Sequence, residues 1–137
     1  MITEISVFLP NNPGVLAKFI DLLNINSIHI KAITVAETPD YGLLLILVDS
    51  PEECIELLEE NNYELSATTV LAVRLSEDLN ALFDIANVLG KNSVNIEYLY
   101  MTVISGNTIM IVRVDDNDKA EEVLKEEGFL LFSIEEL

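Results

Sequence analysis

Short runs of alternating or continuous apolar residues are interspersed with longer stretches in which apolar residues recur every three or four positions. The short runs predict strands, because alternate residues of a strand share a face and a fully buried strand is apolar throughout. In the first half of the chain they lie at residues 2–9, 28–37, 43–48 and 63–69. The longer stretches predict helices at residues 13–23 and 51–60. Turn-forming residues at 38–42 separate the second and third strands, so the predicted order is βαββαβ.

The second half of the chain repeats this pattern at a constant offset of 66 residues. Residues 3–65 align with residues 69–131 without a gap. Identical leucines fall opposite one another in the pairs Leu9/Leu75, Leu16/Leu82 and Leu23/Leu89. A register held over that length predicts an internal duplication, with one domain at residues 1–66 and a second at residues 67–137.

The way in which the two halves join follows from their small size. A βαββαβ unit of this length has a thin core and leaves the edges of its sheet open. Residues 66–73 lead from the last strand of one unit into the first strand of the next, with no flexible linker between them. We therefore predict an α+β fold in which the two units lie side by side, forming a continuous antiparallel sheet with the helices on one face.

The turn between the first predicted strand and the first predicted helix is the strongest local signal in the chain. An Asn before Pro13 and Gly14 predicts a helix start, in which the Asn side chain accepts from a free backbone N–H and Pro13 occupies the first turn. Gly14 leaves the backbone uncovered, and a helix N-terminus attracts carboxylates. The alternative interpretation is an ordinary capped helix that binds nothing.

The run Asn11-Asn12-Pro13-Gly14-Val15-Leu16, placed between strand and helix in a duplicated βαββαβ unit, resembles the signature of the ACT domain family. That signature is an Asp or Asn, any residue, Pro, Gly and then apolar residues. The stretches at residues 33–37 and 95–100 are similar to those of small free-standing tandem ACT proteins. The resemblance implies ferredoxin-like units, a regulatory role, a homodimer and an amino acid bound between two units.

The resemblance also implies which residues touch the ligand. Asn11 would contact the amino group, the amides around Gly14 would hold the carboxylate, and the second strand of the neighbouring unit would form the far wall. The expected ligand-binding residues are Asn11, Asn12, Pro13, Gly14, Val15, Leu16, Tyr98, Leu99, Tyr100 and Met101. For Tyr98 and Tyr100 the alternative is a core position with the hydroxyl at its rim.

The second repeat departs from the signature. Residues 76–82 replace the Pro and Gly of the first repeat, and Asn80 stands opposite Gly14. Glu77 and Asp78 would repel an incoming carboxylate and could themselves satisfy the helix N-terminus. We therefore expect one binding site, with its loop from repeat one and its wall from repeat two.

Composition narrows the classes of partner. The net charge is −17, which repels nucleic acids and anionic membranes but not a zwitterionic amino acid. The longest apolar run, residues 43–48, is too short to span a bilayer. The single cysteine, Cys54, allows no internal disulfide and is typical of the reducing cytoplasm, so we expect a cytoplasmic protein.

The sequence contains few residues of the kinds that carry out catalysis, with one histidine and one cysteine. The single histidine, His29, is interpreted as a structural residue on a strand. We find no metal-ligand spacing, no nucleophile–base pair and no phosphate-binding loop, so we expect no catalytic or metal residue, no cofactor and no enzyme activity. The predicted function is an amino-acid sensor; the alternative is a structural or interaction protein, or a regulatory subunit of a separately encoded metabolic enzyme.

Overall fold

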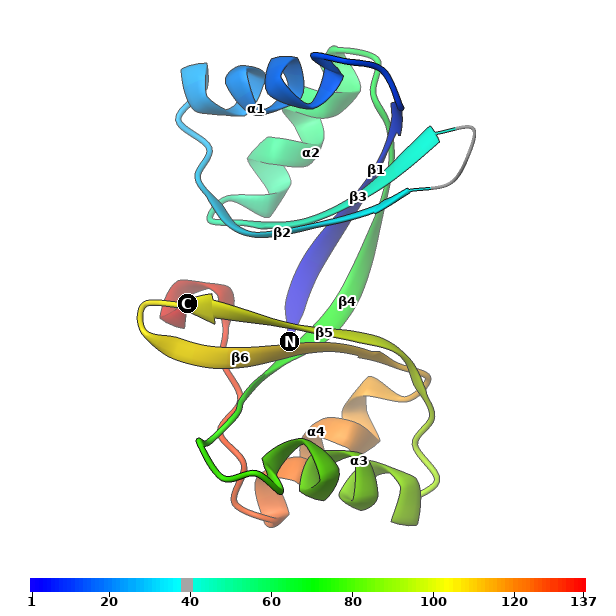
Figure 1. The fold of residues 1–137 in the computed structure, drawn as a ribbon, viewed down its shortest axis with the longest axis vertical. Helices are drawn as coiled ribbons and strands as arrows, with labels where there is room; N and C mark the ends of the chain where they lie inside the picture. The colour runs from blue at the N-terminus through cyan, green and yellow to red at the C-terminus, as the bar shows by residue number, and fades with distance from the viewer. Residues whose placement is uncertain (38–40) are drawn as a thin grey trace. The chain divides into compact units, whose positions relative to one another are not determined.

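The computed structural model describes residues 1–37 and 41–137 of the chain (Figure 1). The elements of the first half are β1 (Ile2–Pro10), α1 (Val15–Ile25), β2 (Ile30–Glu37), β3 (Tyr41–Val48), α2 (Pro51–Glu60) and β4 (Glu64–Arg74). Those of the second half are α3 (Ala81–Lys91), β5 (Ile96–Ile104), β6 (Asn107–Val114), α4 (Asn117–Glu126) and the short 3₁₀ helix η1 (Ile134–Glu136).

The chain divides into two compact units, one of residues 3–68 and one of residues 1–2 and 69–137. In the first unit β3 pairs antiparallel with both β1 and β2, and in the second β6 pairs antiparallel with both β4 and β5. The strand order over the chain is β2-β3-β1-β4-β6-β5, a six-stranded sheet. The predicted α+β fold with two βαββαβ repeats is confirmed. As expected, the last strand of repeat one runs without a break into the first strand of repeat two, as β4.

The final strand of the second repeat is much shorter than that of the first. Leu131 makes an isolated antiparallel bridge to Val73, and hydrogen bonds of 2.9 Å flank it on both sides. One joins the Arg74 N–H to the carbonyl of Leu130, and the other joins the Phe132 N–H to the carbonyl of Ala72.

Each unit has its own core between its sheet and its two helices. In the unit of residues 3–68, Phe19 of α1 and Leu58 of α2 are fully buried with Val7 of β1 and Leu44 of β3. The ring of Phe19 also meets that of Tyr63 edge-on, with centroids 5.3 Å apart. The helices therefore pack on the sheet through buried apolar side chains, and burial of apolar surface is the largest favourable contribution to the free energy of folding.

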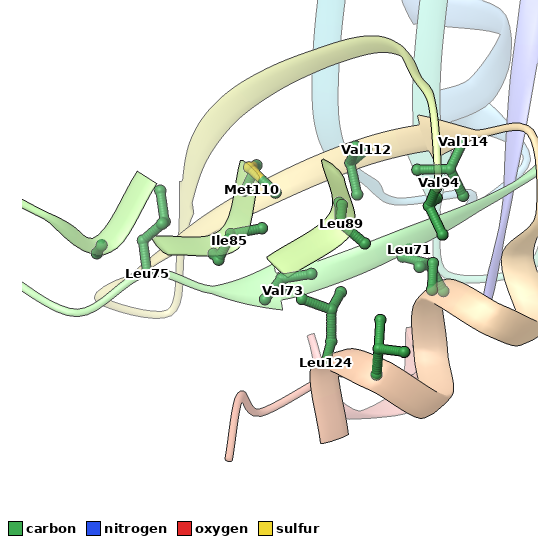
Figure 2. Close-up of a cluster of buried hydrophobic side chains, with 13 residues drawn as sticks. Leu71, Val73, Leu75, Ile85, Leu89, Val94, Met110, Val112, Val114 and Leu124 are labelled. Carbon is green, nitrogen blue, oxygen red and sulfur yellow. The ribbon is translucent and has the colours of Figure 1, made fainter. Parts of the chain in front are cut away.

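The core of the second unit uses the equivalent positions (Figure 2). Leu71, Val73, Met110 and Val112 of the strands are fully buried with Leu89 of α3. The buried residues of the two units correspond at the predicted offset in the pairs Val7/Val73, Phe19/Ile85, Leu23/Leu89, Leu44/Met110 and Leu58/Leu124. The two repeats inferred from the sequence therefore bury side chains at equivalent positions.

Several predicted boundaries differ from the structure: β2 begins at Ile30 and not at residue 28, and β4 extends to Arg74, beyond the predicted end at residue 69. Helix α1 begins at Val15, not at Pro13, because Gly14 is its N-cap and Pro13 lies before it. The predicted turn at 38–42 is too long, since β3 already begins at Tyr41. Its first three residues, 38–40, lie outside the described residues.

Candidate functional site

The loop between β1 and α1 turns on Gly14. Its backbone has φ 85° and ψ −12°, in the left-handed region that favours glycine. The predicted side-chain cap is wrong: no side chain accepts a hydrogen bond at this helix start. Instead the Val15 N–H donates to the backbone carbonyl of Asn12 at 3.3 Å, and the Lys18 N–H donates to the carbonyl of Gly14 at 3.1 Å.

This arrangement leaves part of the helix N-terminus unsatisfied. Within the described residues, the N–H groups of Gly14, Leu16 and Ala17 have no hydrogen-bond acceptor. The side-chain amides of Asn11 and Asn12 are exposed and make no hydrogen bond there either. The Val15 N–H is not available in the same way, because the carbonyl of Asn12 accepts it. Free donors and free amide groups together suit a small polar ligand.

A cavity of about 90 Å³ opens beside this loop. Its lining residues are Leu9, Pro10, Asn11, Asn12, Leu16, Val35, Gly42 and Leu44. All belong to the unit of residues 3–68, so one unit builds this cavity by itself. Leu9 and Leu44 are buried at its base, whereas Val35 keeps 47% of its surface exposed. The cavity therefore combines an apolar base with two amide side chains.

The structure brings only some of the predicted loop residues to this cavity. Asn11, Asn12 and Leu16 line it, while Pro13, Gly14 and Val15 lie on the same loop and helix start without lining it. The predicted ligand-binding residues do not include Pro10, Val35, Gly42 and Leu44, which also line the cavity. The signal for these was the strand pairing, in which Leu9 stands opposite Gly42 and Val35 opposite Leu44.

In the corresponding loop of the second unit, side chains accept backbone N–H groups. The carboxylate of Asp78 accepts the Asn80 N–H at 2.8 Å, and the Oγ of Ser76 accepts the Asp78 N–H at 3.4 Å. Asn80 has φ −91°, so the left-handed turn of Gly14 has no counterpart here. The Asp78 carboxylate thus accepts the N–H of Asn80, the residue before α3. The prediction that an acidic side chain satisfies the N-terminus of this helix is wrong, because no side chain caps α3.

The other predicted site residues, Tyr98 to Met101, lie on β5 of the second unit. Leu99 and Met101 are exposed, and Tyr98 and Tyr100 are half-buried. The guanidinium carbon of Arg113 lies 6.0 Å from the ring centroid of Tyr98, and Arg113 also forms a 2.8 Å salt bridge with Glu97. Leu99 and Met101 share one face of the strand, since successive side chains alternate.

A larger cavity of about 340 Å³ lies in the second unit, and its lining residues are not those of either loop. Its lining residues are Asp84, Asn87, Val88, Lys91, Asn92, Glu127 and Phe129. It is mostly polar and charged, so it offers less apolar surface for a side chain than the smaller cavity beside Gly14.

Among the described residues, no cluster of three or more His, Cys, Asp or Glu side chains could hold a metal ion. Burial, together with the negative charge of Asp49, raises the pKa of the Cys54 thiol to about 11. A thiol with that pKa is a poor nucleophile at neutral pH. In the described part of the chain, no helix combines the length and apolar character needed to cross a membrane.

The duplicated βαββαβ architecture, with a cavity at the first strand–helix loop, defines a tandem of ferredoxin-like domains. A family model described as an ACT domain pair matches residues 1–136. The chain therefore belongs to the ACT domain pair family, as the loop signature predicted. No curated protein matches the chain.

Solved structures agree with this assignment. The crystal structure of protein BT0572 from Bacteroides thetaiotaomicron is similar to this chain, with 28% sequence identity and a TM-score of 0.89. The match covers 96% of this chain and 91% of BT0572. The regulatory subunit of aspartate kinase from Thermus thermophilus, in a ligand-free form, matches over 92% of both chains with 16% identity and a TM-score of 0.67. That of Thermus flavus covers 90% of both, with 15% identity and a TM-score of 0.62. The two Thermus proteins share the fold with this chain.

Proposed function

We propose that this protein is a non-catalytic regulatory sensor that binds a free amino acid at the start of α1. The observation that carries the proposal is the cavity beside Gly14, where an apolar base meets two unengaged Asn side chains and unsatisfied helix N–H groups. The family assignment supports a regulatory role, and the structurally similar Thermus proteins are regulatory subunits of an enzyme.

An amino acid has three parts, and the loop offers a partner for each. The N–H groups of Leu16 and Ala17 suit the carboxylate, aided by the partial positive charge of the helix terminus. The side-chain oxygen of Asn11 suits the ammonium group. An aliphatic or aromatic side chain would lie against Val35 and the apolar base of the cavity.

The remaining features of the sensor are also proposals. We retain residues 1–66 and 67–137 as the two ACT domains, and Tyr98 to Met101 as proposed ligand-binding residues of the second. A homodimer in the cytoplasm, acting on a separately encoded metabolic enzyme, fits a sensor that has no catalytic residues of its own.

The test is a thermal-shift screen of the twenty amino acids against the full chain. At one hundred times its dissociation constant, a ligand that binds only the folded state adds about 2.7 kcal/mol to the free energy of unfolding. One amino acid, or a few of related side chain, should therefore raise the melting temperature by several degrees. If no amino acid raises it, the sensor proposal is wrong for this ligand class.

Matched variants locate the site. Asn11→Ala should remove the ligand-induced shift and leave the unliganded melting temperature unchanged, because Asn11 makes no hydrogen bond to the described residues. Glu77→Ala, in the corresponding loop of repeat two, is the control and should retain the shift. Loss of the shift in Glu77→Ala alone would move the site to the second unit.

A further inference from the structure

The unit of residues 69–137 exposes large apolar side chains around the start of α3. Leu79 is 99% exposed in the loop before the helix, and Phe83 is 65% exposed in its first turn beside Leu82. Val103, near the end of β5, is 68% exposed. We call these four residues the α3 patch. Apolar side chains gathered at one place on a surface mark interaction sites more often than scattered ones do.

The strand pairing brings Val103 to the α3 side of the sheet. Val103 stands opposite Thr108 of β6, and the carbonyl of Thr108 accepts the N–H of Leu75 at 2.9 Å. The end of β5 is therefore close to the loop that leads into α3. Val103 also shares a face with Met101, which pairs with the buried core residue Met110, so it lies on the face that the helices cover.

The fold does not require this apolar surface. At the offset of 66 residues, Leu79 corresponds to Pro13, and Phe83 corresponds to Ala17. The first unit thus builds the same helix start with small side chains and without the exposed leucine and phenylalanine. The second unit has a right-handed backbone at Asn80 in place of the left-handed turn at Gly14, and it exposes apolar side chains beside it.

Exposed carboxylates adjoin the α3 patch along the chain. Glu77 and Asp78 precede Leu79 in its loop, Asp84 follows Phe83 in α3, and no lysine or arginine occurs between Arg74 and Lys91. Arg74 alternates with the buried Val73 and Leu75, so it lies on the other face of β4. Lys91 is two helical turns beyond Phe83, about 12 Å along the axis, and lines the same cavity as Asp84.

We propose that the α3 patch docks a basic, amphipathic segment of another protein, whose apolar side chains cover Leu79 and Phe83 while its cations face the acidic rim. The charge decides the occupant. A second copy docked at this patch would bring the same acidic rim against this one and would be repelled there. Nucleic acids and anionic membranes would be repelled by the net charge of −17. The proposal does not depend on amino-acid binding at the first loop.

The test uses the full chain and a fluorescein-labelled peptide of leucine and lysine, with the leucines on one face of a helix. Fluorescence anisotropy without any amino acid should give saturable binding. The double variant Leu79→Ser/Phe83→Ser should weaken it at least tenfold, and the same should follow from replacing the leucines of the peptide with serine. Ile25→Ser, which removes a 71% exposed side chain from α1 of the first unit, is the matched control and should bind normally.

A charge variant separates the rim from the apolar centre. Glu77→Gln/Asp84→Asn should weaken the peptide severalfold and flatten the dependence of its affinity on salt. Equal affinity of the wild type and the Leu79→Ser/Phe83→Ser variant would overturn the proposal, and so would equal binding of the serine peptide. A concentration-dependent dimer in sedimentation equilibrium that the double variant abolishes would instead assign the patch to a second copy and overturn it too.

Discussion

Asp49 and His29 exchange two hydrogen bonds: Oδ1 of Asp49 accepts the His29 N–H at 3.0 Å, and the Asp49 N–H donates to the His29 carbonyl at 3.1 Å. Asp115 and Asn95 repeat this exchange at 2.9 and 3.1 Å. In each pair, the residue just before an edge strand (β2 or β5) bonds to the residue just after the neighbouring strand (β3 or β6). The strand pairing shifts register just beyond, between Ile30 and Ala32 in the first unit and at the equivalent position of the second. The carboxylate therefore fixes the start of the edge strand at a point where the register shift interrupts the regular pairing with its neighbour.

Removing that carboxylate should destabilise the unit that contains it. Asp49→Ala leaves the His29 N–H without its acceptor, so we expect the free energy of unfolding to fall by about 1–2 kcal/mol. Asp49→Asn keeps an acceptor oxygen and should cost less. Urea unfolding followed by circular dichroism measures both, and Asp115→Ala should behave like Asp49→Ala. An unchanged midpoint in both alanine variants would show that water replaces the carboxylate at no cost.

The helix ends suggest a pair of stabilising substitutions. Ser27 and Ser93, at equivalent positions after α1 and α3, have φ 59° and 60°, in the left-handed region. A residue with a Cβ pays roughly 1–2 kcal/mol there, whereas glycine does not. Glycine is also the more flexible in the unfolded chain, which offsets part of the gain. Ser27→Gly and Ser93→Gly should each therefore raise the free energy of unfolding by about 0.5 kcal/mol.

The control for these glycine substitutions is a position of ordinary backbone geometry. Asn80→Gly, at φ −91°, gains no relief of strain and should not stabilise. Thermal melts of the three variants under one buffer give the comparison. Stabilisation by Asn80→Gly equal to that by Ser27→Gly would remove strain as the explanation.

Gly14 provides the opposite case. A Cβ added there meets no atom within 4 Å, but φ of 85° strains any residue that carries one. Gly14→Ala should therefore lower the free energy of unfolding by about 1 kcal/mol through the backbone alone. Asn80→Ala, at the equivalent position with φ −91°, should change it by less than about 0.5 kcal/mol. Equal losses in the two variants would contradict this account of the loop.

Periodicity predicted the fold well because local and tertiary signals agree in this chain. The helix predicted at residues 51–60 is α2 to the residue, with Pro51 in its first turn. The repeat offset predicted which side chains are buried together, as for Phe19 and Ile85. The error at α1 is physical: Gly14 is itself the N-cap, and Asn12 acts through its carbonyl instead of its side chain.

The cavity was predictable only in part. The loop residues carry a sequence signature, and Asn11 and Leu16 indeed line the cavity. Its other side consists of Val35, Gly42 and Leu44, which come from two strands that are paired in space. A single sequence gives the face of each strand but not the register between them, and that register decides which side chain reaches the loop.

Cys54 makes the stability of the first unit depend on pH above neutrality. Its side chain is fully buried in α2, and burial with the negative charge of Asp49 raises its pKa from 9.0 to about 11. Below pH 9 the thiol is protonated in both the folded and the unfolded states, so its contribution to stability is complete. Between pH 9 and 11 the unfolded state loses the proton first, and the free energy of unfolding should fall by roughly 1.4 kcal/mol per pH unit.

Cys54→Ala isolates this contribution, since the equivalent residue of the second unit is the fully buried Ala120. Urea unfolding of the wild type from pH 8 to 11 should lose stability more steeply than that of the variant, with the two curves diverging above pH 9. Reaction with a disulfide reagent at pH 8 should be negligible in the folded wild type and rapid in urea, because only the unfolded chain presents a thiol of ordinary pKa. Two outcomes together would contradict this account: stability curves of the wild type and Cys54→Ala that run parallel from pH 8 to 11, and fast labelling of the folded wild type. They would show that solvent reaches the thiol, whereas the structure buries it completely in the core of the first unit.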